Sequence, residues 1–288
     1  MQAKQEFLEK DIRLHALLRH LTQDAPIAKE LVFKGGTCLI KCYLGYYRFS
    51  VDLDFTWLHQ SDWHELPAGK ARDATRFARH AWVASVEAAA KKFGYGFDPK
   101  AIIWGATSRM ATANLSYKSL SGQDDYIKIQ INFIEPLLFP TKIQEVQTLI
   151  SGDEPKALRL LDDADTKSYR EGYSVVCYDP REIAAEKCRA ILTRKAAKGR
   201  DVLDVYLLEK KFGVRIEELR DAIQAKLDLA MRYGDKYADN MELAEANIQA
   251  IVEWDYKAVV LDSKSMDRPS FDAYRTRALA FVRGYLPK

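Results

Sequence analysis

The sequence predicts an α+β fold: an N-terminal part with a mixed or antiparallel sheet flanked by helices, followed by an all-helical C-terminal part. Alternation of apolar and polar residues, typical of half-buried strands, occurs before residue 134. From residue 181 onward the apolar residues follow a helical spacing almost to the end of the chain. Because the pattern changes between about residues 140 and 180, we expect two domains, residues 1–175 and 176–288.

Composition is that of an ordinary globular protein, with 48% hydrophobic and 30% charged residues in 288. No apolar run approaches the roughly 20 residues that span a bilayer, and the N-terminal 21 residues carry charges where a signal peptide would be apolar. We therefore expect no membrane segment and a cytoplasmic location. The four cysteines have no CxxC spacing and are too few for a disulfide scaffold, so we expect reduced, packed thiols.

The N-terminal part is expected to begin with an amphipathic helix over residues 3–22. After it we expect a short strand at 31–33, a glycine turn, a helix at 37–44, a strand at 47–56, a helix at 71–93, strands between 97 and 134, and a mixed helix-and-loop connector at 141–172. In the C-terminal part, helices are expected at 181–197, 200–212, 215–233, 241–252 and 271–284, separated by glycines and by the DKYADN and DSKSMDRP loops.

Two aspartates on the 47–56 strand are the first candidates for chemistry. Side chains alternate along a strand, so Arg48, Ser50, Asp52 and Asp54 are expected on one face, with apolar residues on the other. Two carboxylates about 7 Å apart at their Cα atoms repel each other unless a cation lies between them. Mg²⁺, with Mn²⁺ as the alternative ion, suits carboxylate oxygens and substrate phosphates.

A second strand, YIKIQINFI, has the same alternation. Lys128, Gln130 and Asn132 share its polar face, and three isoleucines and a phenylalanine share the other. The Gly35-Gly36 turn precedes a helix that has Thr37 near its N-terminus, where free N–H groups favour an anion. A phosphate would therefore fit between that turn and a metal on the aspartates.

The order of strand, glycine turn, short helix and aspartate strand resembles the nucleotidyltransferase superfamily that includes DNA polymerase β. More closely, the chain resembles the AbiEii/AbiGii family of abortive-infection toxins. Its KGGT motif is Lys34-Gly35-Gly36-Thr37, and its RFSxDxD motif runs from Arg48 to Asp54. A later AEKxxA…R…RDxxD segment reads as 185–190, Arg194 and 200–204. The resemblance covers most of residues 30 to 210.

The resemblance implies a nucleotidyltransferase domain at residues 1–175 that uses an NTP and a divalent metal. The residues that would contact the nucleotide are Lys34, Gly35, Gly36, Thr37, Arg48, Ser50, Lys128, Arg194, Asp201 and Asp204. Asp52, Asp54 and Lys187 would be catalytic, and Asp52, Asp54 and Gln130 would hold the metal. Lys187 and Arg194, seven residues apart, would lie on one helix face and reach the triphosphate.

One position departs from the superfamily pattern. A third carboxylate commonly comes from the middle strand, but the matching position here is Gln130, a weaker neutral ligand. Glu135 is a possible substitute, although its odd position places it on the apolar face if the strand continues that far. Lys128 would point toward the aspartates and offset phosphate charge.

Several of these residues also have structural interpretations. Lys187 and Arg194 could be solvent-facing helix charges, and Asp201 or Asp204 could cap a helix that begins after Gly199. The basic cluster Arg194, Lys195, Lys198 and Arg200 is compatible with an RNA acceptor but is also typical of a solvated helix end.

The resulting hypothesis is a toxin that transfers a nucleoside monophosphate from an NTP to an acceptor, with release of pyrophosphate. The resemblance implies a two-gene toxin–antitoxin or phage-defence system with a cognate antitoxin, and a tRNA 3′ end as the acceptor. Two alternatives remain open: a related enzyme that modifies a protein or a small molecule, and a non-catalytic module that binds NTP or RNA. Gln130, in place of a carboxylate, keeps the second alternative open.

Overall fold

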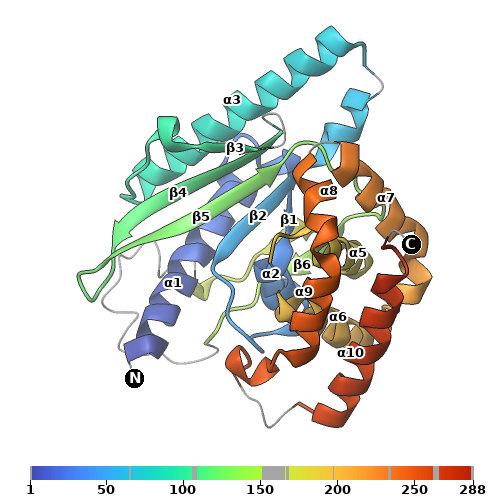
Figure 1. The fold of residues 1–288 in the computed structure, drawn as a ribbon. Coiled ribbons are helices and arrows are strands. Elements are labelled where there is room, and N and C mark those ends of the chain that lie inside the picture. The colour runs from blue at the N-terminus through green and yellow to red at the C-terminus, as the bar shows by residue number, and fades with distance from the viewer. Residues whose placement is uncertain are drawn as a thin grey trace. The chain divides into compact units, whose positions relative to one another are not determined.

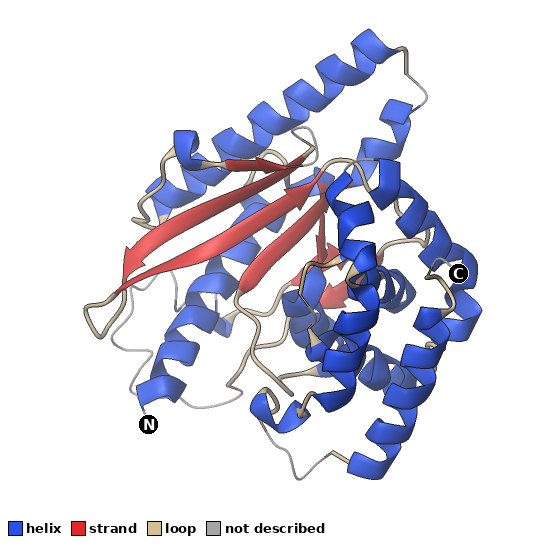
Figure 2. Cartoon of the chain, in the orientation of Figure 1, coloured by secondary structure: helices blue, strands red, loops and turns tan. Residues whose placement is uncertain are grey.

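The computed structural model describes residues 2–64, 66–105, 109–150, 166, 169–196, 198–232, 235–261 and 266–286. The chain divides into two compact units. Unit 1 comprises Met1–Gly45, Ser50–Leu137 and Thr141–Tyr178, and unit 2 comprises Tyr46–Phe49, Leu138–Pro140 and Asp179–Lys288. Unit 1 holds the sheet, and unit 2 is built from helices (Figure 2).

Unit 1 is organised around a mixed sheet. Over the described residues the sheet has seven strands in the order β3-β4-β5-β2-β1-β7-β6. Their bounds are β1 Leu31–Lys34, β2 Asp52–Trp57, β3 Ile103–Gly105, β4 Met110–Lys118, β5 Asp124–Asn132, β6 Lys142–Glu145 and β7 Ser174–Cys177. β2 pairs parallel with β5 and β1 pairs parallel with β7, whereas the other pairs are antiparallel. The predicted α+β class is confirmed.

The alternation predicted for the two central strands is present. Leu53 and Phe55 on β2 are buried beside Ile129 and Ile131 on β5, in register. The residues between them turn to the opposite, more accessible face. Each strand therefore has a packed side and a polar side, as expected of half-buried strands.

Three longer helical segments belong to unit 1. α1 (Gln2–Arg19) continues into a π-helical turn, η1 (His20–Asp24), and α2 (Gly35–Cys38) continues into a second, η3 (Leu39–Leu44). α3 (Ala68–Lys92) follows β2 through the 3₁₀ segment η4 (Leu58–His64). In Figure 1, α1 passes behind the central strands of the sheet, and α3 runs along the edge of the sheet that carries β3.

Two sequence predictions in this part of the chain are wrong. The aspartate strand begins at Asp52, not at residue 47, because residues 46–49 belong to unit 2, where the buried Arg48 is paired with a carboxylate. The 141–172 connector contributes strand β6, whose four residues are too few to show a period. Residues 151–165 of that connector lie outside the described part of the chain.

Unit 2 contains the predicted C-terminal helices, with two corrections. The helices are α5 Pro180–Thr193, α6 Gly199–Phe212, α7 Arg220–Arg232, α8 Asp235–Glu242, α9 Ala244–Glu253 and α10 Arg268–Arg283, with 3₁₀ turns η7 (Ile216–Leu219) and η8 (Tyr256–Ala258). α5 ends at Thr193, not at residue 197, because the amides of Asn240 and Asn247 donate to the carbonyl oxygens of Thr193 and Arg194. The DKYADN stretch, expected to be a loop, begins α8.

None of the helices in the described ranges is both long enough and apolar enough to cross a membrane.

A buried ion pair holds three segments of unit 2 together. Glu182 on α5 lies 2.6 Å from the ammonium group of Lys226 on α7, and both side chains are almost completely buried. The other carboxylate oxygen of Glu182 accepts hydrogen bonds from the backbone N–H groups of Leu138 and Phe139. Glu182 therefore links α5 to α7 and to the segment 138–140.

We expect Lys226→Met to destabilise the protein by about 3–5 kcal/mol, because it leaves the Glu182 carboxylate buried without its cation. Urea unfolding at neutral pH measures the loss. Lys257→Met, which removes an exposed lysine of the same unit, is the control. Equal stability of the two variants would contradict the assigned role.

Candidate active site

Asp52 and Asp54 lie at the start of β2, with their side chains on the polar side of the sheet. In the parallel register Asp52 is opposite Lys128, and Asp54 is opposite Gln130. On the other side of β2, Asp54 is opposite Lys34 of β1. The Asp52 side chain is 33% exposed, so solvent or a ligand can reach it. The sheet therefore brings five of the predicted residues together.

Gly35 packs directly against Asp54. Its φ of 78° lies in the left-handed region, and a Cβ atom there would overlap the carboxylate oxygen Oδ2 of Asp54. Only glycine satisfies both conditions at this position. The first turn of α2 is thus held against a catalytic candidate, and the glycine pair is more than a flexible linker.

Thr37 fixes the approach to β2 from the same turn. Its buried hydroxyl donates to the backbone carbonyl oxygen of Asp52 at 2.5 Å and lies 2.9 Å from the hydroxyl of Ser50. Helix α2 and the beginning of the aspartate strand are therefore joined by a hydroxyl, which limits the positions that the Asp52 side chain can take.

Lys128 and Gln130 have different partners on the polar face. The Lys128 ammonium group lies 2.7 Å from Asp52 Oδ2. The Gln130 amide nitrogen donates to the hydroxyl of Thr112 on β4 at 2.9 Å. In this orientation, the amide oxygen is the Gln130 atom that can ligate a cation. Gln130 is thus positioned by Thr112, a partner that the sequence pattern did not indicate.

Glu135 is not on a strand. β5 ends at Asn132, and the amide of Asn132 donates to Glu135 Oε2 at 2.9 Å. Glu135 is buried and lies 3.6 Å from the ammonium group of Lys34. The strand does not continue to Glu135, so the condition that would place this residue on the apolar face is not met, and its carboxylate lies beside the lysine of the KGGT motif.

Unit 2 contains a second cluster, which we call the Asp204 cluster: Tyr47, Arg48, Lys187, Arg194, Asp201 and Asp204. Arg48 donates to both oxygens of Asp204, at 2.8 and 2.7 Å, and is 2% exposed. Lys187 lies 2.5 Å from Asp204 and 2.9 Å from Asp201. The cluster also includes an ion pair between Arg194 and Asp201 and a hydrogen bond from the Tyr47 hydroxyl to Asp204.

Electrostatics in the Asp204 cluster favour the ionised form of its central acid. Burial alone would raise the pKa of Asp204, but Lys187 and Arg48 hold it well below its usual range. Burial lowers the pKa of Lys187 despite the attraction of Asp204. Three cations face two carboxylates, so the described side chains of the cluster carry a surplus of one positive charge.

The cluster changes the interpretation of several predicted residues. The N-cap of α6 is Lys198, so neither Asp201 nor Asp204 caps the helix. Arg194 follows α5 in extended conformation and is not on the helix face of Lys187, although both contact Asp201. Tyr47 was not predicted from the sequence as a member of this cluster. Its place next to Arg48 in the sequence was the one feature that could have indicated it. Of the other basic residues, Lys195 and Lys198 are exposed and Arg200 is half-buried.

The cysteines are packed thiols, as predicted. All four are free and buried, and the sulfur atoms of Cys38, Cys42 and Cys177 lie within 4.8 Å of one another. Burial raises the pKa of Cys38 well above its usual value, and hydrogen bonding to Cys177 does the same for Cys42.

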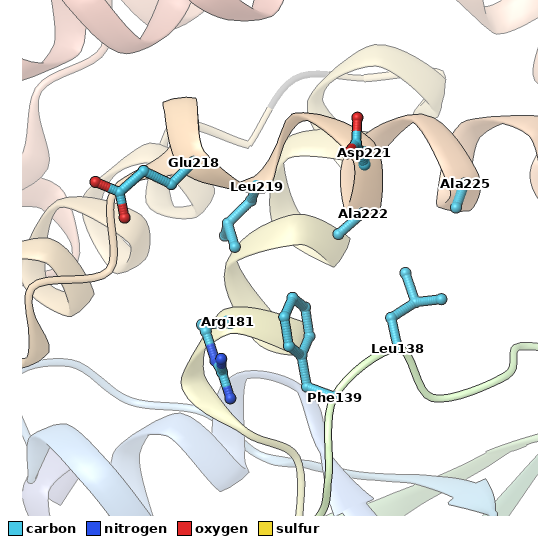
Figure 3. Close-up of a pocket in the computed structure, with 8 residues that line it drawn as sticks. All are labelled: Leu138, Phe139, Arg181, Glu218, Leu219, Asp221, Ala222 and Ala225. Atoms are coloured by element: carbon cyan, nitrogen blue, oxygen red, sulfur yellow. The ribbon is translucent and has the colours of Figure 1, made fainter.

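A pocket of about 570 Å³ in unit 2 contains none of the predicted residues. Figure 3 shows Leu138 and Phe139 facing Ala222 across it, with the carboxylates of Glu218 and Asp221 directed away from its centre. The guanidinium of Arg181 lies over the Phe139 ring, 4.5 Å from its centroid, and is paired with Asp179. An apolar pocket bordered by acids is unsuited to a triphosphate.

The family model described as "Nucleotidyl transferase AbiEii toxin, Type IV TA system" matches residues 16–277. The chain belongs to this family. It is therefore a toxin nucleotidyltransferase of the AbiEii type, which uses an NTP. The description of the family places its members in toxin–antitoxin systems. The resemblance inferred from the KGGT and RFSxDxD motifs is confirmed.

Among solved structures, MenT4, a nucleotidyltransferase toxin from Mycobacterium tuberculosis H37Rv, has a similar fold. The TM-score is 0.55 with 19% sequence identity, over 95% of this chain and 82% of the MenT4 chain. Comparison with curated proteins gives no significant sequence match.

We expect Gly35→Ala to abolish most nucleotide transfer, because the added methyl group overlaps the Asp54 carboxylate and strains a left-handed backbone. The strain alone costs about 1–2 kcal/mol. Gly122→Ala is a matched control: Gly122 has a φ of 81°, but no atom lies within 4 Å of the position that an added Cβ would take. Full activity of Gly35→Ala, or equal loss in the control, would contradict the role of the contact.

The depressed pKa of Asp204 predicts a loss of stability in acid. The pKa of Asp204 is lower in the folded state than its unfolded value of about 3.9. Above about pH 3.9 the ionised Asp204 therefore adds to the free energy of unfolding, and this contribution is lost as the pH falls from there through the folded-state pKa. Asp204→Asn should unfold more easily at pH 7 and lose less stability than wild type between pH 5 and 3. Urea unfolding at each pH measures the free energy of unfolding, and Asp228→Asn, which changes an exposed aspartate, is the control. If stability depends on pH equally in wild type and in Asp204→Asn, the assigned role of Asp204 is contradicted.

Proposed function

We propose that the chain transfers a nucleoside monophosphate from an NTP to the 3′ end of a tRNA, with release of pyrophosphate. The observation that supports this most strongly is the convergence of Asp52, Asp54 and the Gly35 turn on one accessible face of the sheet. Carboxylates beside backbone N–H groups suit a nucleotide that brings phosphates and a divalent cation together.

The donor atoms on this face fit Mg²⁺, or Mn²⁺ as the alternative. Asp52, Asp54 and the amide oxygen of Gln130 are hard oxygen ligands. The ammonium group of Lys128 already lies on Asp52 Oδ2, so this carboxylate is paired with a cation in the absence of metal. When bound, the metal would neutralise developing charge on the phosphates and the attacking oxygen.

The chain's own residues would position the nucleotide. The N–H groups of Gly35 and Gly36 belong to the first turn of α2 and are not used within the helix, so they can donate to phosphate oxygens. Thr37 and Ser50 would keep the aspartate strand at a fixed distance from that turn. Lys34 and Lys128 would offset phosphate charge, Lys128 after release from Asp52.

The Asp204 cluster is proposed to bind phosphate as well. Its surplus positive charge is buried with Arg48 and Lys187, where an anion interacts more strongly than it would in water. Lys187 and the partly exposed Arg194 would contact a phosphate group, and Asp201 and Asp204 would hold these cations in place. Lys195, Lys198 and Arg200 are compatible with an RNA acceptor.

The biological setting that we propose is a cytoplasmic toxin whose effect is countered by a cognate antitoxin, in a system that limits phage infection. The family description supports the antitoxin. Enzymes with the same arrangement of carboxylates could use a hydroxyl of a protein or of a small molecule, so the acceptor has to be determined directly.

Incubation of the protein with each labelled NTP, Mg²⁺ and total tRNA tests the proposal. We expect label at the tRNA 3′ end, loss of at least about 100-fold in Asp52→Asn and Asp54→Asn because the metal ligands are gone, and no labelling in the presence of a chelator. Asp124→Asn, which removes an exposed carboxylate of the same unit, should label like wild type.

The acceptor is decided in the same experiment by adding cell lysate freed of RNA. Label on protein or on a small molecule, with none on tRNA, would replace the tRNA assignment. Equal labelling by wild type and the two aspartate variants would contradict the assigned site.

A further inference from the structure

The N-terminal half of α3 is exposed on most of its circumference. Lys70, Arg72, Arg76 and Phe77 are exposed, and Phe77 is 73% exposed. The buried residues of this helix begin at Ala78 and Trp82. Figure 1 shows that the N-terminal end of α3 extends beyond the ends of the neighbouring strands β4 and β5, all within unit 1. The sheet therefore does not need these residues for its core.

Positive charge is concentrated on this half-helix. Arg72, Arg76 and Arg79 are spaced by four and three residues and form a stripe along one side. Residues 68–81 contain four basic residues and one acid, Asp73. The surplus of three positive charges equals the formal net charge of the entire chain. Such a concentration on one accessible helix is an electrostatic footprint of polyanion binding.

Aromatic rings accompany the arginines. The guanidinium of Arg79 lies 5.7 Å from the ring centroid of Trp104, on the edge strand β3. Trp104 is 38% exposed, and its ring also packs edge-to-face on the buried Trp82. A fixed, partly exposed indole beside arginines is suited to stacking on an unpaired base.

We propose that Lys70, Arg72, Arg76, Phe77, Arg79 and Trp104, the α3 surface, bind the body of the RNA acceptor. This inference rests on the proposed transfer to tRNA and extends it to a second contact. The stripe from Arg72 to Arg79 is about 10 Å long, at 1.5 Å per residue. A stripe of this length can contact more than one phosphate of a strand.

The position of the surface favours a long acceptor. β2 extends about 17 Å from Asp52 to Trp57, at 3.3 Å per residue, and η4 then separates it from α3. A small molecule held at Asp52 and Asp54 would have to span the length of β2 to reach the end from which η4 leads into α3, whereas an RNA is long enough to do so. Charge complementarity favours RNA over a protein, because residues 68–81 carry four basic side chains and one acid.

The test is tRNA binding by Arg72→Gln/Arg76→Gln, measured by fluorescence anisotropy without NTP over about 50–200 mM salt. Both arginines are exposed, and the Arg76–Asp73 pair at 3.4 Å is solvated, so folding should be unaffected. We expect the affinity to fall about tenfold and the slope of log K against log salt to decrease by about 1.5. Lys91→Gln/Lys118→Gln removes the same charge from exposed sites of unit 1 and should bind like wild type.

Transfer to a short single-stranded RNA with the tRNA 3′ sequence separates this inference from the proposed function. The double variant should label the short RNA at the wild-type rate but label tRNA more slowly at limiting concentration. If wild type labels no RNA, the proposed function fails. The anisotropy measurement then still shows whether the α3 surface binds tRNA. An unchanged tRNA affinity and salt slope would overturn the inference, as would loss of antitoxin binding with RNA binding intact.

Discussion

The contact between Gly35 and the Asp54 carboxylate is the constraint on which the candidate site depends. It fixes the first turn of α2 against the third residue of β2, at a distance that no other amino acid permits. Thr37, two residues further along the chain, adds a hydrogen bond to Asp52. The N–H groups proposed to bind phosphate and the carboxylates proposed to bind the metal are consequently held against each other in one part of unit 1.

Charges in unit 2 follow a different principle. The Asp204 cluster places five ionised groups and a tyrosine in a region where single buried charges are costly. The two aspartates lie three residues apart on α6, and Gly199 at the start of that helix packs so closely on Trp254 that a side chain would overlap the ring. The helix that carries the acids is thereby fixed in position. A fixed arrangement with one surplus positive charge suits the phosphate contact that we propose for this cluster.

The fold and the catalytic candidates could be predicted where short-range rules apply. Alternation predicted Leu53, Phe55, Ile129 and Ile131 on the packed face of their strands, and consequently Asp52 and Asp54 on the opposite, polar face. The KGGT and RFSxDxD motifs were enough to indicate the family. Pairing between residues far apart in the sequence could not be predicted. The alternation extends the strand back to residue 47, but Arg48 pairs with Asp204, 156 residues later, and so belongs to unit 2. The orientation of Gln130 depends on Thr112 on another strand, and no local pattern carries that information.

The membership of residues 46–49 in unit 2 has a consequence for synthesis. Arg48 leaves the ribosome long before Asp204, and at roughly 5–20 residues per second the interval is about 8–30 seconds. The described strands of unit 1 are complete by residue 177, so its sheet can form during that interval. The Asp204 cluster cannot form then, because four of its six members, Lys187, Arg194, Asp201 and Asp204, follow residue 177. A chain made in this order can assemble the strand that carries Asp52 and Asp54 first and the Asp204 cluster last, so a chain that stops before residue 187 lacks the cluster.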